Sequence, residues 1–258
     1  MNEFFTDKLI DRYDRVARLY PVYLAVAPAI FLIVVLALGA PEWWSRLGAI
    51  AVAIGAPLFV VQFGRSAGKR KEAALFAWRG GAPALTLLRH RSPTSNPVTL
   101  ERRHRLVEAA TGVHLPTAEE ERANPDAADG AYQSAVNSLK ELTRDRGRFP
   151  LVFNELVNYG FRRNLWGLKP FGVSLAAASA ASSAVILLWE VLADIRWSPA
   201  APALSLGVSI VVLGVWSAVV TPPWVNQTAE AYAERLLASA ELLARHAPPV
   251  ANPRSRGR

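Results

Sequence analysis

The chain contains no cysteine and a single methionine. The lack of cysteine excludes disulfide bonds, thiolate-ligated zinc, iron–sulfur clusters and thiol catalysis. Charged residues are scarce as well, because they make up 19% of the 258 residues, whereas an average soluble domain has about 25%. Hydrophobic residues reach 52%. This balance is typical of a protein with a large membrane-embedded part.

Charge is absent altogether from four long stretches. They lie between Arg18 and Glu42, Arg46 and Arg65, Lys169 and Glu190, and Arg196 and Glu230. A helix needs roughly 20 apolar residues to cross a hydrocarbon core about 30 Å thick. Each stretch is long enough for one such helix, and the predicted spans are residues 20–39, 47–63, 170–192 and 201–220.

Lysine and arginine are distributed unequally around these spans. The segment 65–169 carries 18 of them, the segments before the first span and after the last carry 4 and 5, and the two short connectors carry one each. Basic loops stay on the cytoplasmic side because their translocation is unfavourable. We therefore expect both termini and the insert 65–169 to be cytoplasmic, and the connectors at 40–46 and 193–199 to be external turns.

These features predict an all-α integral membrane protein, with four transmembrane helices in two hairpins flanking an α-helical cytoplasmic insert. Its predicted parts are an amphipathic juxtamembrane helix at 1–19, a hairpin at 20–64, a basic sensor domain at 65–169, a second hairpin at 170–220, and a C-terminal helix with a disordered tail at 221–258.

The insert shows helix signals and no persuasive two-residue alternation. Thr99 is a candidate N-cap for a helix that Gly112 ends, and Thr117 with Glu120 has the spacing of a capping box. Asn124 or Asp126 opens the next helix, and a further one runs from 150 to 161. The apolar stripe of the C-terminal helix, at Leu236, Leu237, Ala240, Leu243 and Ala244, requires a packing partner.

Clustered basic residues in the insert suggest an anion site. Guanidinium groups and backbone amides at a helix start are good phosphate ligands. The candidate ligand-binding residues are Arg89, His90, Arg91, Arg102, Arg103, Arg105, Arg144 and Arg146. Two other interpretations stay open, namely a solvated basic face and a surface for a protein partner.

Further basic residues lie beside the membrane spans. Lys69 and Arg70 follow the second span, while Arg162, Arg163 and Lys169 precede the third. Contact with anionic membrane lipids is the simplest interpretation of these cations. Because the same residues join the insert to the spans, they are also candidates for gating, that is, for coupling a sensor to a pore.

The third span carries an unusually polar face. Ser179, Ser183, Ile186 and Glu190 recur on it at helical spacing. Small residues of this kind allow close helix packing. They can instead line a pore, in which a ring of Glu190 carboxylates in a symmetric oligomer would favour cations. No span has a charge at its centre, which favours a passive pore over coupled transport.

Catalytic motifs are missing. The chain has no Walker loop, no G-x-S-x-G motif and no H-E-x-x-H motif. Its four histidines do not have the spacing of metal ligands. We therefore expect no enzymatic activity, no metal site and no cofactor.

The hairpins around a basic helical insert, together with the stretches 87–91, 143–146 and 159–170, resemble membrane effectors of bacterial anti-phage systems. The resemblance is to effectors paired with nucleotidyltransferases. It implies a homo-oligomeric, ligand-gated ion channel in the bacterial inner membrane, whose cytoplasmic domain binds a nucleotide or single-stranded oligonucleotide made by a nucleotidyltransferase partner. The competing class is a non-channel membrane scaffold whose insert binds a protein or anionic lipid.

Overall fold

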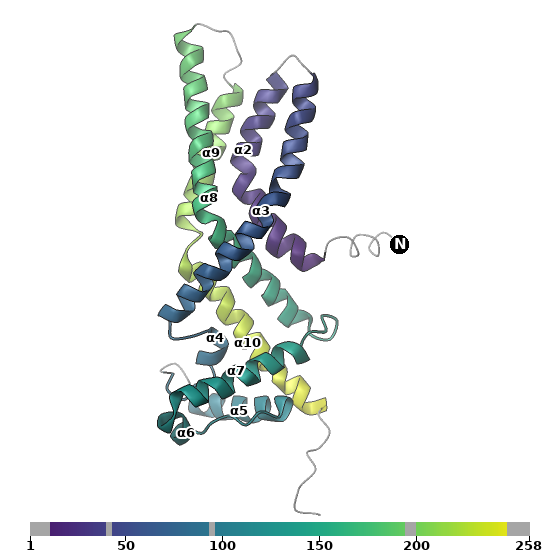
Figure 1. The fold of residues 1–258 in the computed structure, drawn as a ribbon, viewed down its shortest axis with the longest axis vertical. Coiled ribbons are helices and arrows are strands. Elements are labelled where there is room, and N and C mark those ends of the chain that lie inside the picture. Colours follow the sequence, from purple (N-terminus) through teal and green to yellow (C-terminus); the bar gives the residue numbers. More distant parts are fainter. Residues whose placement is uncertain (1–10, 40–42, 93–95, 194–199, 247–258) are drawn as a thin grey trace, which may run out of the picture. The chain divides into compact units, whose positions relative to one another are not determined.

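The computed structural model describes residues 11–39, 43–92, 96–193 and 200–246. In this part of the chain every regular element is a helix and no strand occurs, so the predicted all-helical class is confirmed there. The elements are η1 (Asp14–Leu19), a π-helix, and the α-helices α2 (Tyr20–Gly39), α3 (Trp43–Trp78), α4 (Pro83–Thr86), α5 (Pro97–Thr111), α6 (Ala118–Ala123), α7 (Pro125–Leu142), α8 (Pro150–Leu192), α9 (Ala200–Ala218) and α10 (Pro222–His246) (Figure 1).

Some predicted segments lie outside the described residues. These are the first ten residues of the juxtamembrane segment, residues 40–42 and 194–199 of the two predicted turns, and the predicted disordered tail from residue 247 onward. The described remainder of the juxtamembrane segment is helical, and η1 continues directly into α2.

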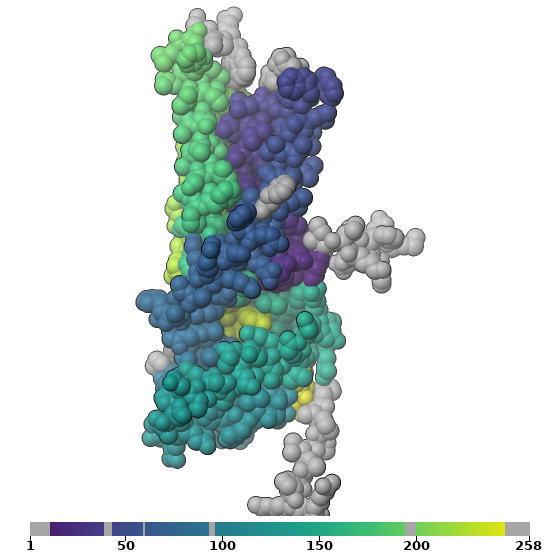
Figure 2. All heavy atoms as spheres, in the orientation of Figure 1, coloured from purple at the N-terminus to yellow at the C-terminus, as the bar shows by residue number. Residues whose placement is uncertain are grey.

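Among the described residues, four helical segments are long and apolar enough to cross a membrane. They are Asp14–Leu38, Trp43–Thr86, Pro150–Leu192 and Ala200–Ala218. Large apolar side chains such as Ile54, Val191 and Val211 are exposed on them, and Figure 2 shows the surface that α3 and α8 present. Exposed apolar surface of this extent is unusual for a soluble monomer. The four predicted spans are thus matched by four helices of membrane length.

The chain forms two compact units. Unit 1 comprises Met1–Leu75 and Val157–Gln227, and unit 2 comprises Phe76–Leu156 and Thr228–Arg258. The helices α3, α8 and α10 contribute residues to both units. The sequence places the insert boundaries where the charge begins and ends, at 65 and 169. The contacts instead assign both ends of that segment to unit 1 and add most of α10 to unit 2.

Within unit 1, α3 and α8 approach each other at three glycines. A Cβ atom on Gly167 would lie 2.4 Å from the backbone nitrogen of Gly68 and 2.9 Å from the backbone oxygen of Gly64. Gly64 and Gly68 have the G-x-x-x-G spacing that allows helix backbones to pack closely. This pattern is visible in the sequence, and it marks the contact of the two helices.

The helix α8 continues through Pro170, although the sequence predicts a helix to 161 and a separate span from 170. Proline has no amide hydrogen for the carbonyl four residues earlier. In α8 that carbonyl belongs to Trp166, and Lys71 Nζ donates to its oxygen at 2.7 Å. Lys71 therefore replaces the missing helical donor, which helps the helix to continue.

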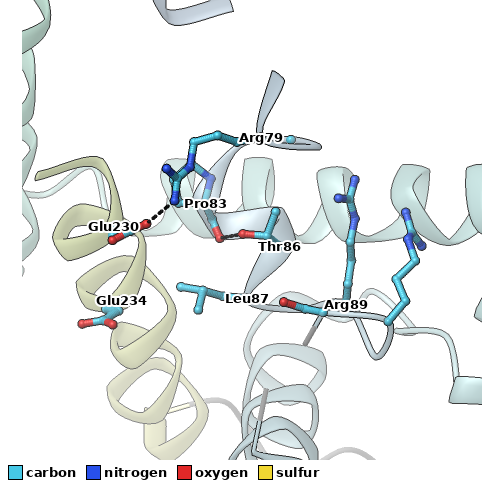
Figure 3. A pocket seen from close by; sticks show the side chains of 10 residues that line it. Arg79, Pro83, Thr86, Leu87, Arg89, Glu230 and Glu234 are labelled. Carbon is cyan, nitrogen blue, oxygen red and sulfur yellow. Dashed lines mark hydrogen bonds and ion pairs between the residues drawn. The ribbon is translucent and has the colours of Figure 1, made fainter. Parts of the chain in front are cut away.

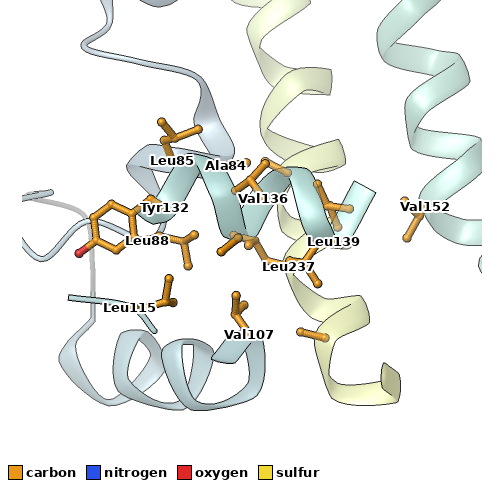
Figure 4. Close-up of a cluster of buried hydrophobic side chains, with 14 of the residues drawn as sticks. Ala84, Leu85, Leu88, Val107, Leu115, Tyr132, Val136, Leu139, Val152 and Leu237 are labelled. Carbon is orange, nitrogen blue, oxygen red and sulfur yellow. The ribbon is translucent and has the colours of Figure 1, made fainter. Parts of the chain in front are cut away.

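Unit 2 has a hydrophobic core of its own. Most of its buried side chains come from α4, α5, α7, α10 and the turn after α4, and they include Leu85, Leu88, Val107, Tyr132, Val136, Leu139 and Leu237 (Figure 4). Leu236, Leu237 and Ala240 of α10 are fully or almost fully buried in this cluster. The apolar stripe of the C-terminal helix thus packs within unit 2.

Helix caps in unit 2 match the sequence with one exception. The Thr117–Glu120 capping box is present, because Thr117 Oγ1 accepts from the Glu120 amide and Glu120 Oε2 accepts from the Thr117 amide. Gly112 ends α5 in the left-handed conformation. The N-cap of α5 is Asn96, not Thr99 as predicted, because the Asn96 side chain accepts from the amide of Val98 at 3.0 Å.

Candidate functional site

Unit 2 contains a cavity of about 690 Å³. This volume lies in the range of small-molecule sites, which is about 300–1,000 Å³. Arginines and glutamates line it, so its wall is strongly charged (Figure 3). The lining residues are Arg79, Gly81, Pro83, Thr86, Leu87, Arg89, Arg91, Ser92, Glu230 and Glu234.

The wall of the cavity is built around a pair of glycines after α3. Gly80 and Gly81 have φ angles of 79° and 142°, which favour glycine. Arg89 Nη1 donates to the carbonyl oxygen of Gly80. A Cβ atom on Gly81 would lie 3.2 Å from Arg89 Nη2. The two glycines therefore turn the chain and leave room for the Arg89 guanidinium.

Arg89 and Arg91 share one carboxylate. Arg89 binds Asp129 through two hydrogen bonds, from Nε to Oδ1 and from Nη2 to Oδ2, each 2.7 Å long. Arg91 Nη2 donates to the same two oxygens at 2.7 and 2.8 Å. Arg91 Nη1 also donates to Glu121 Oε1 at 2.9 Å. Two guanidinium groups thus face two carboxylates, so this part of the wall has no surplus positive charge.

Glu121 is the buried centre of this network, with 2% of its surface exposed. It accepts hydrogen bonds from the Tyr132 hydroxyl at 2.7 Å and from the amides of His90 and Arg91 at 2.8 and 3.1 Å. Burial raises the pKa of Glu121, but these donors outweigh burial and hold the pKa below its ordinary value. The carboxylate is therefore charged at neutral pH and fixes the turn that carries both arginines.

The other predicted ligand residues lie elsewhere on unit 2. Arg102, Arg105 and Arg144 form exposed ion pairs with Glu241, Glu101 and Glu141, at 3.1, 3.6 and 3.3 Å. Exposed pairs of this kind contribute little to stability.

Three further residues of the predicted set also make contacts inside unit 2. Arg103 Nη1 donates to the carbonyl of the cavity residue Leu87 at 2.8 Å. Arg146 lies 4.7 Å over the ring of Phe153, and His90 Nε2 is 3.2 Å from the carbonyl oxygen of Pro116. The eight predicted residues therefore do not form one site, because only Arg89 and Arg91 reach the cavity. Arg79, an isolated basic residue in the sequence, also lines the cavity and begins an Arg-Gly-Gly sequence after α3.

In unit 1 the predicted coupling residues of α8 bind neighbouring helices. Arg162 Nη1 donates to the Trp224 carbonyl at 2.9 Å, Arg163 Nη1 lies 3.3 Å from Glu72 Oε2, and Lys169 Nζ donates to the Val220 carbonyl at 2.9 Å. Glu72 also accepts from the Tyr159 hydroxyl. The predicted residues Lys69 and Arg70 are exposed. Lys71, the third residue of this basic cluster, and the adjacent Glu72 make the contacts instead.

A row of buried serines lies in two of the membrane-length helices, Ser179 and Ser183 in α8 and Ser205 and Ser209 in α9. We call these four residues the polar seam. At most 3% of any of them is exposed. In the described part of the chain, the hydroxyls of Ser183, Ser205 and Ser209 have no hydrogen-bond partner.

The helices α8 and α9 contact each other beside Gly172 and Lys169. A Cβ atom on Gly172 would lie 2.5 Å from the ring of Trp216, and Lys169 reaches Val220, so the two helices run antiparallel. Seven residues along α8 from Gly172 is Ser179, and seven residues back along α9 from Trp216 is Ser209. Ser183 and Ser205 follow one turn further in the same register.

The four predicted pore-lining residues therefore lie in different environments. Ser179 and Ser183 lie inside the protomer and not on an outer face, where the lining of a pore between subunits would require them. Ile186 is partly exposed. Both carboxylate oxygens of Glu190 are buried, and neither has a hydrogen-bond partner among the described residues.

No group of three or more histidines, aspartates or glutamates that could hold a metal ion occurs in the described ranges. No known protein family, no curated protein and no solved structure matches this chain.

Proposed function

We propose that this protein is a ligand-gated membrane channel, in which the polar seam marks the path and unit 2 is the sensor. The polar seam is the observation that carries the proposal. A buried hydroxyl without a hydrogen bond costs about 1–3 kcal/mol by mutational data. Polar groups inside membrane helices tend to mark functional pathways. Three such hydroxyls in one seam favour a function over simple packing.

Opening of the channel would supply the hydrogen-bond partners that the buried serine hydroxyls lack. Water that enters between α8 and α9 can hydrogen-bond to each serine hydroxyl, and small side chains require little displacement to admit it. The unpartnered carboxylate of Glu190 lies seven residues beyond Ser183 on α8. A carboxylate near one end of the path would favour cations. The structure described here, with its buried hydroxyls, then corresponds to the closed state.

The charge distribution supports a specific arrangement in the membrane. We place the spans as two hairpins, with unit 2 and both termini in the cytoplasm, because the two connectors carry only two of the 29 lysines and arginines. The resemblance noted above supports assembly as a homo-oligomer in a bacterial inner membrane, a nucleotidyltransferase partner, and a role in anti-phage defence. Orientation is tested by tags at Pro41 or Ala127, of which only the first should be accessible from outside.

The sensor part of the proposal rests on the cavity of unit 2. Arg79 lies 3.3 Å from Glu230, and the two side chains are 42% and 50% exposed. Exposed ion pairs are weak, whereas a phosphate can accept two hydrogen bonds from one guanidinium. A phosphate ligand can therefore replace Glu230 at Arg79. The cavity volume suits a small nucleotide better than an extended single strand.

Ligand binding would reach the seam through α10. Glu230 and Glu234 lie one turn apart on this helix, and both line the cavity. The same helix begins at Pro222, directly after α9, which carries Ser205 and Ser209. A ligand that displaces Glu230 from Arg79 changes the contacts of α10. Because α10 follows α9 in the chain, this change can be transmitted to α9.

Replacing Arg79 with alanine should weaken nucleotide binding by roughly 10- to 100-fold, because hydrogen bonds to charged groups contribute about 1.5–3 kcal/mol. Isothermal titration of the purified protein with a panel of mono- and dinucleotides measures this. Arg105→Ala is the matched control, since Arg105 is exposed and does not line the cavity. Equal losses in the two variants would mean that the binding is a general effect of charge.

Leucine at Ser183 should block ion flux, because a bulky apolar side chain fills the seam. The neighbouring Ser182 is exposed, so Ser182→Leu is the matched control and should conduct like the wild type. Flux is measured in liposomes with and without nucleotide. The variant Ser183→Cys tests directly whether water reaches this position, since the chain has no other cysteine. A water-soluble thiol reagent should modify the new cysteine only in the open state. No flux under any condition, and no modification, would favour the scaffold.

A further inference from the structure

Two lysines of unit 1 donate hydrogen bonds to backbone carbonyls rather than to carboxylates. Lys71 Nζ donates to the Trp166 carbonyl at 2.7 Å. Lys169 Nζ donates to the Val220 carbonyl at 2.9 Å and lies 3.5 Å from the carbonyl oxygen of Ser217. Both carbonyls lack a helical donor, the first because of Pro170 and the second because α9 has ended. An ammonium group has three hydrogens, so each lysine keeps donors for a further ligand.

The charges of this lysine pair are not balanced by neighbouring acids. Glu72, the carboxylate next to Lys71 in the sequence, is engaged by Arg163 and Tyr159. In the described part of the chain no carboxylate forms an ion pair with Lys71 or Lys169. Lys71 Nζ binds the carbonyl of Trp166, which lies one turn before Lys169 on α8, so the two ammonium groups are neighbours and repel each other. Two adjacent, partly exposed cations with free donors form a site at which a bound anion would lower the free energy of the protein.

The pair lies inside α3 and α8, near the points where their charge-free stretches end. Lys169 directly precedes Pro170, where one charge-free stretch begins, and Lys71 belongs to the basic residues that follow the second predicted span. The ring of Trp166 lies 5.2 Å from Lys71 Nζ. Tryptophan is enriched where a membrane meets water, at the depth of the lipid headgroups. The depth, the charge and the free donors therefore all match a lipid phosphate.

We propose that Lys71 and Lys169 form a binding site for the phosphate group of an anionic membrane lipid. The phosphate would accept hydrogen bonds from both ammonium groups and relieve their repulsion, while Trp166 borders the headgroup. Because Lys71 belongs to α3 and Lys169 to α8, a bound lipid phosphate would link these two helices. The site does not depend on the proposed channel activity.

Native mass spectrometry of the full-length protein in detergent tests the site. With equal amounts of phosphatidylglycerol and phosphatidylcholine, the wild type should retain the anionic lipid preferentially. The variant Lys71→Gln/Lys169→Gln keeps donors for the carbonyls but removes both charges. It should bind phosphatidylglycerol roughly 30-fold more weakly, because each of the two basic residues near an anionic headgroup increases the affinity about fivefold. Lys69→Gln, which removes an exposed charge two residues from Lys71, should change the affinity only slightly.

Three results would overturn the proposal. They are equal retention of both lipids by the wild type, equal effects of Lys69→Gln and the double variant, and complete displacement of phosphatidylglycerol by inorganic phosphate, which would assign the site to a soluble ligand. If the glutamine variant does not fold, Lys71→Arg/Lys169→Arg decides, since it keeps both charges and should retain the lipid. Ion flux enters none of these measurements, so they are separate from the test of the channel.

Discussion

Replacing Gly167 with alanine should destabilise the protein by about 3 kcal/mol, because the added methyl group would overlap the backbone of α3. The overlap cannot be relieved by rotation of a side chain, since the nearest atoms are the backbone nitrogen and Cα of Gly68 and the backbone oxygen of Gly64. In an unobstructed helix the same change stabilises by about 1 kcal/mol. The sign of the effect therefore tests the close contact of α3 and α8.

The measurement is the thermal midpoint of the detergent-solubilised protein, followed by size-exclusion chromatography. Gly207→Ala on α9 is the control, because nothing lies within 4 Å of its added Cβ atom. It should leave the midpoint unchanged or raise it. A midpoint for Gly167→Ala that equals the control would show that α3 and α8 do not pack through these glycines.

Replacing Glu121 with alanine should destabilise unit 2 by about 3 kcal/mol, because the change removes a buried acceptor of several hydrogen bonds. The change leaves the buried Tyr132 hydroxyl and the amides of His90 and Arg91 without their acceptor. Each unsatisfied buried group costs about 1–3 kcal/mol. Hydrogen–deuterium exchange locates the effect, and the amides of α7 should exchange much faster. Glu119→Ala, at an exposed neighbouring position, should stay within about 0.5 kcal/mol of the wild type.

The same carboxylate makes unit 2 sensitive to acid. The folded pKa of Glu121 lies below its ordinary value of 4.5, so its contribution to stability is complete above that pH and is lost as the pH falls further. Burial raises the pKa of Asp129, but hydrogen bonds from Arg89 and Arg91 outweigh it and lower this pKa as well. In the variant Glu121→Gln the acid-induced loss should be smaller. An unchanged pH profile would assign the loss to other groups.

Local patterns predict much of the helical framework. Charge-free stretches select the four membrane-length helices because a polar or charged side chain in lipid is costly. The Thr117–Glu120 capping box and the end of α5 at Gly112 also follow from short-range chemistry. The prediction of separate helices at 150–161 and from 170 is wrong, because α8 is continuous and Lys71, 99 residues before Pro170, replaces the missing amide donor.

Charge clusters predict less of the candidate site, because the sequence does not reveal which residue an arginine pairs with. Arg89 and Arg91 read as a basic pair, yet the fold turns Asp129 and Glu121 toward them. Conversely, Arg79 enters the cavity only because Gly80 and Gly81 turn the chain beside it.

The sequence by itself determined the helical class, the four helices of membrane length and several of their caps, since each depends on residues within one or two turns. Only the tertiary structure decided which arginines are neutralised, that α10 completes the core of unit 2, and that Ser183 and Ser205 lie buried in one seam. These features depend on pairs of side chains far apart in the chain. Their partners are chosen by the register of helices that pack against each other, which local periodicity does not encode.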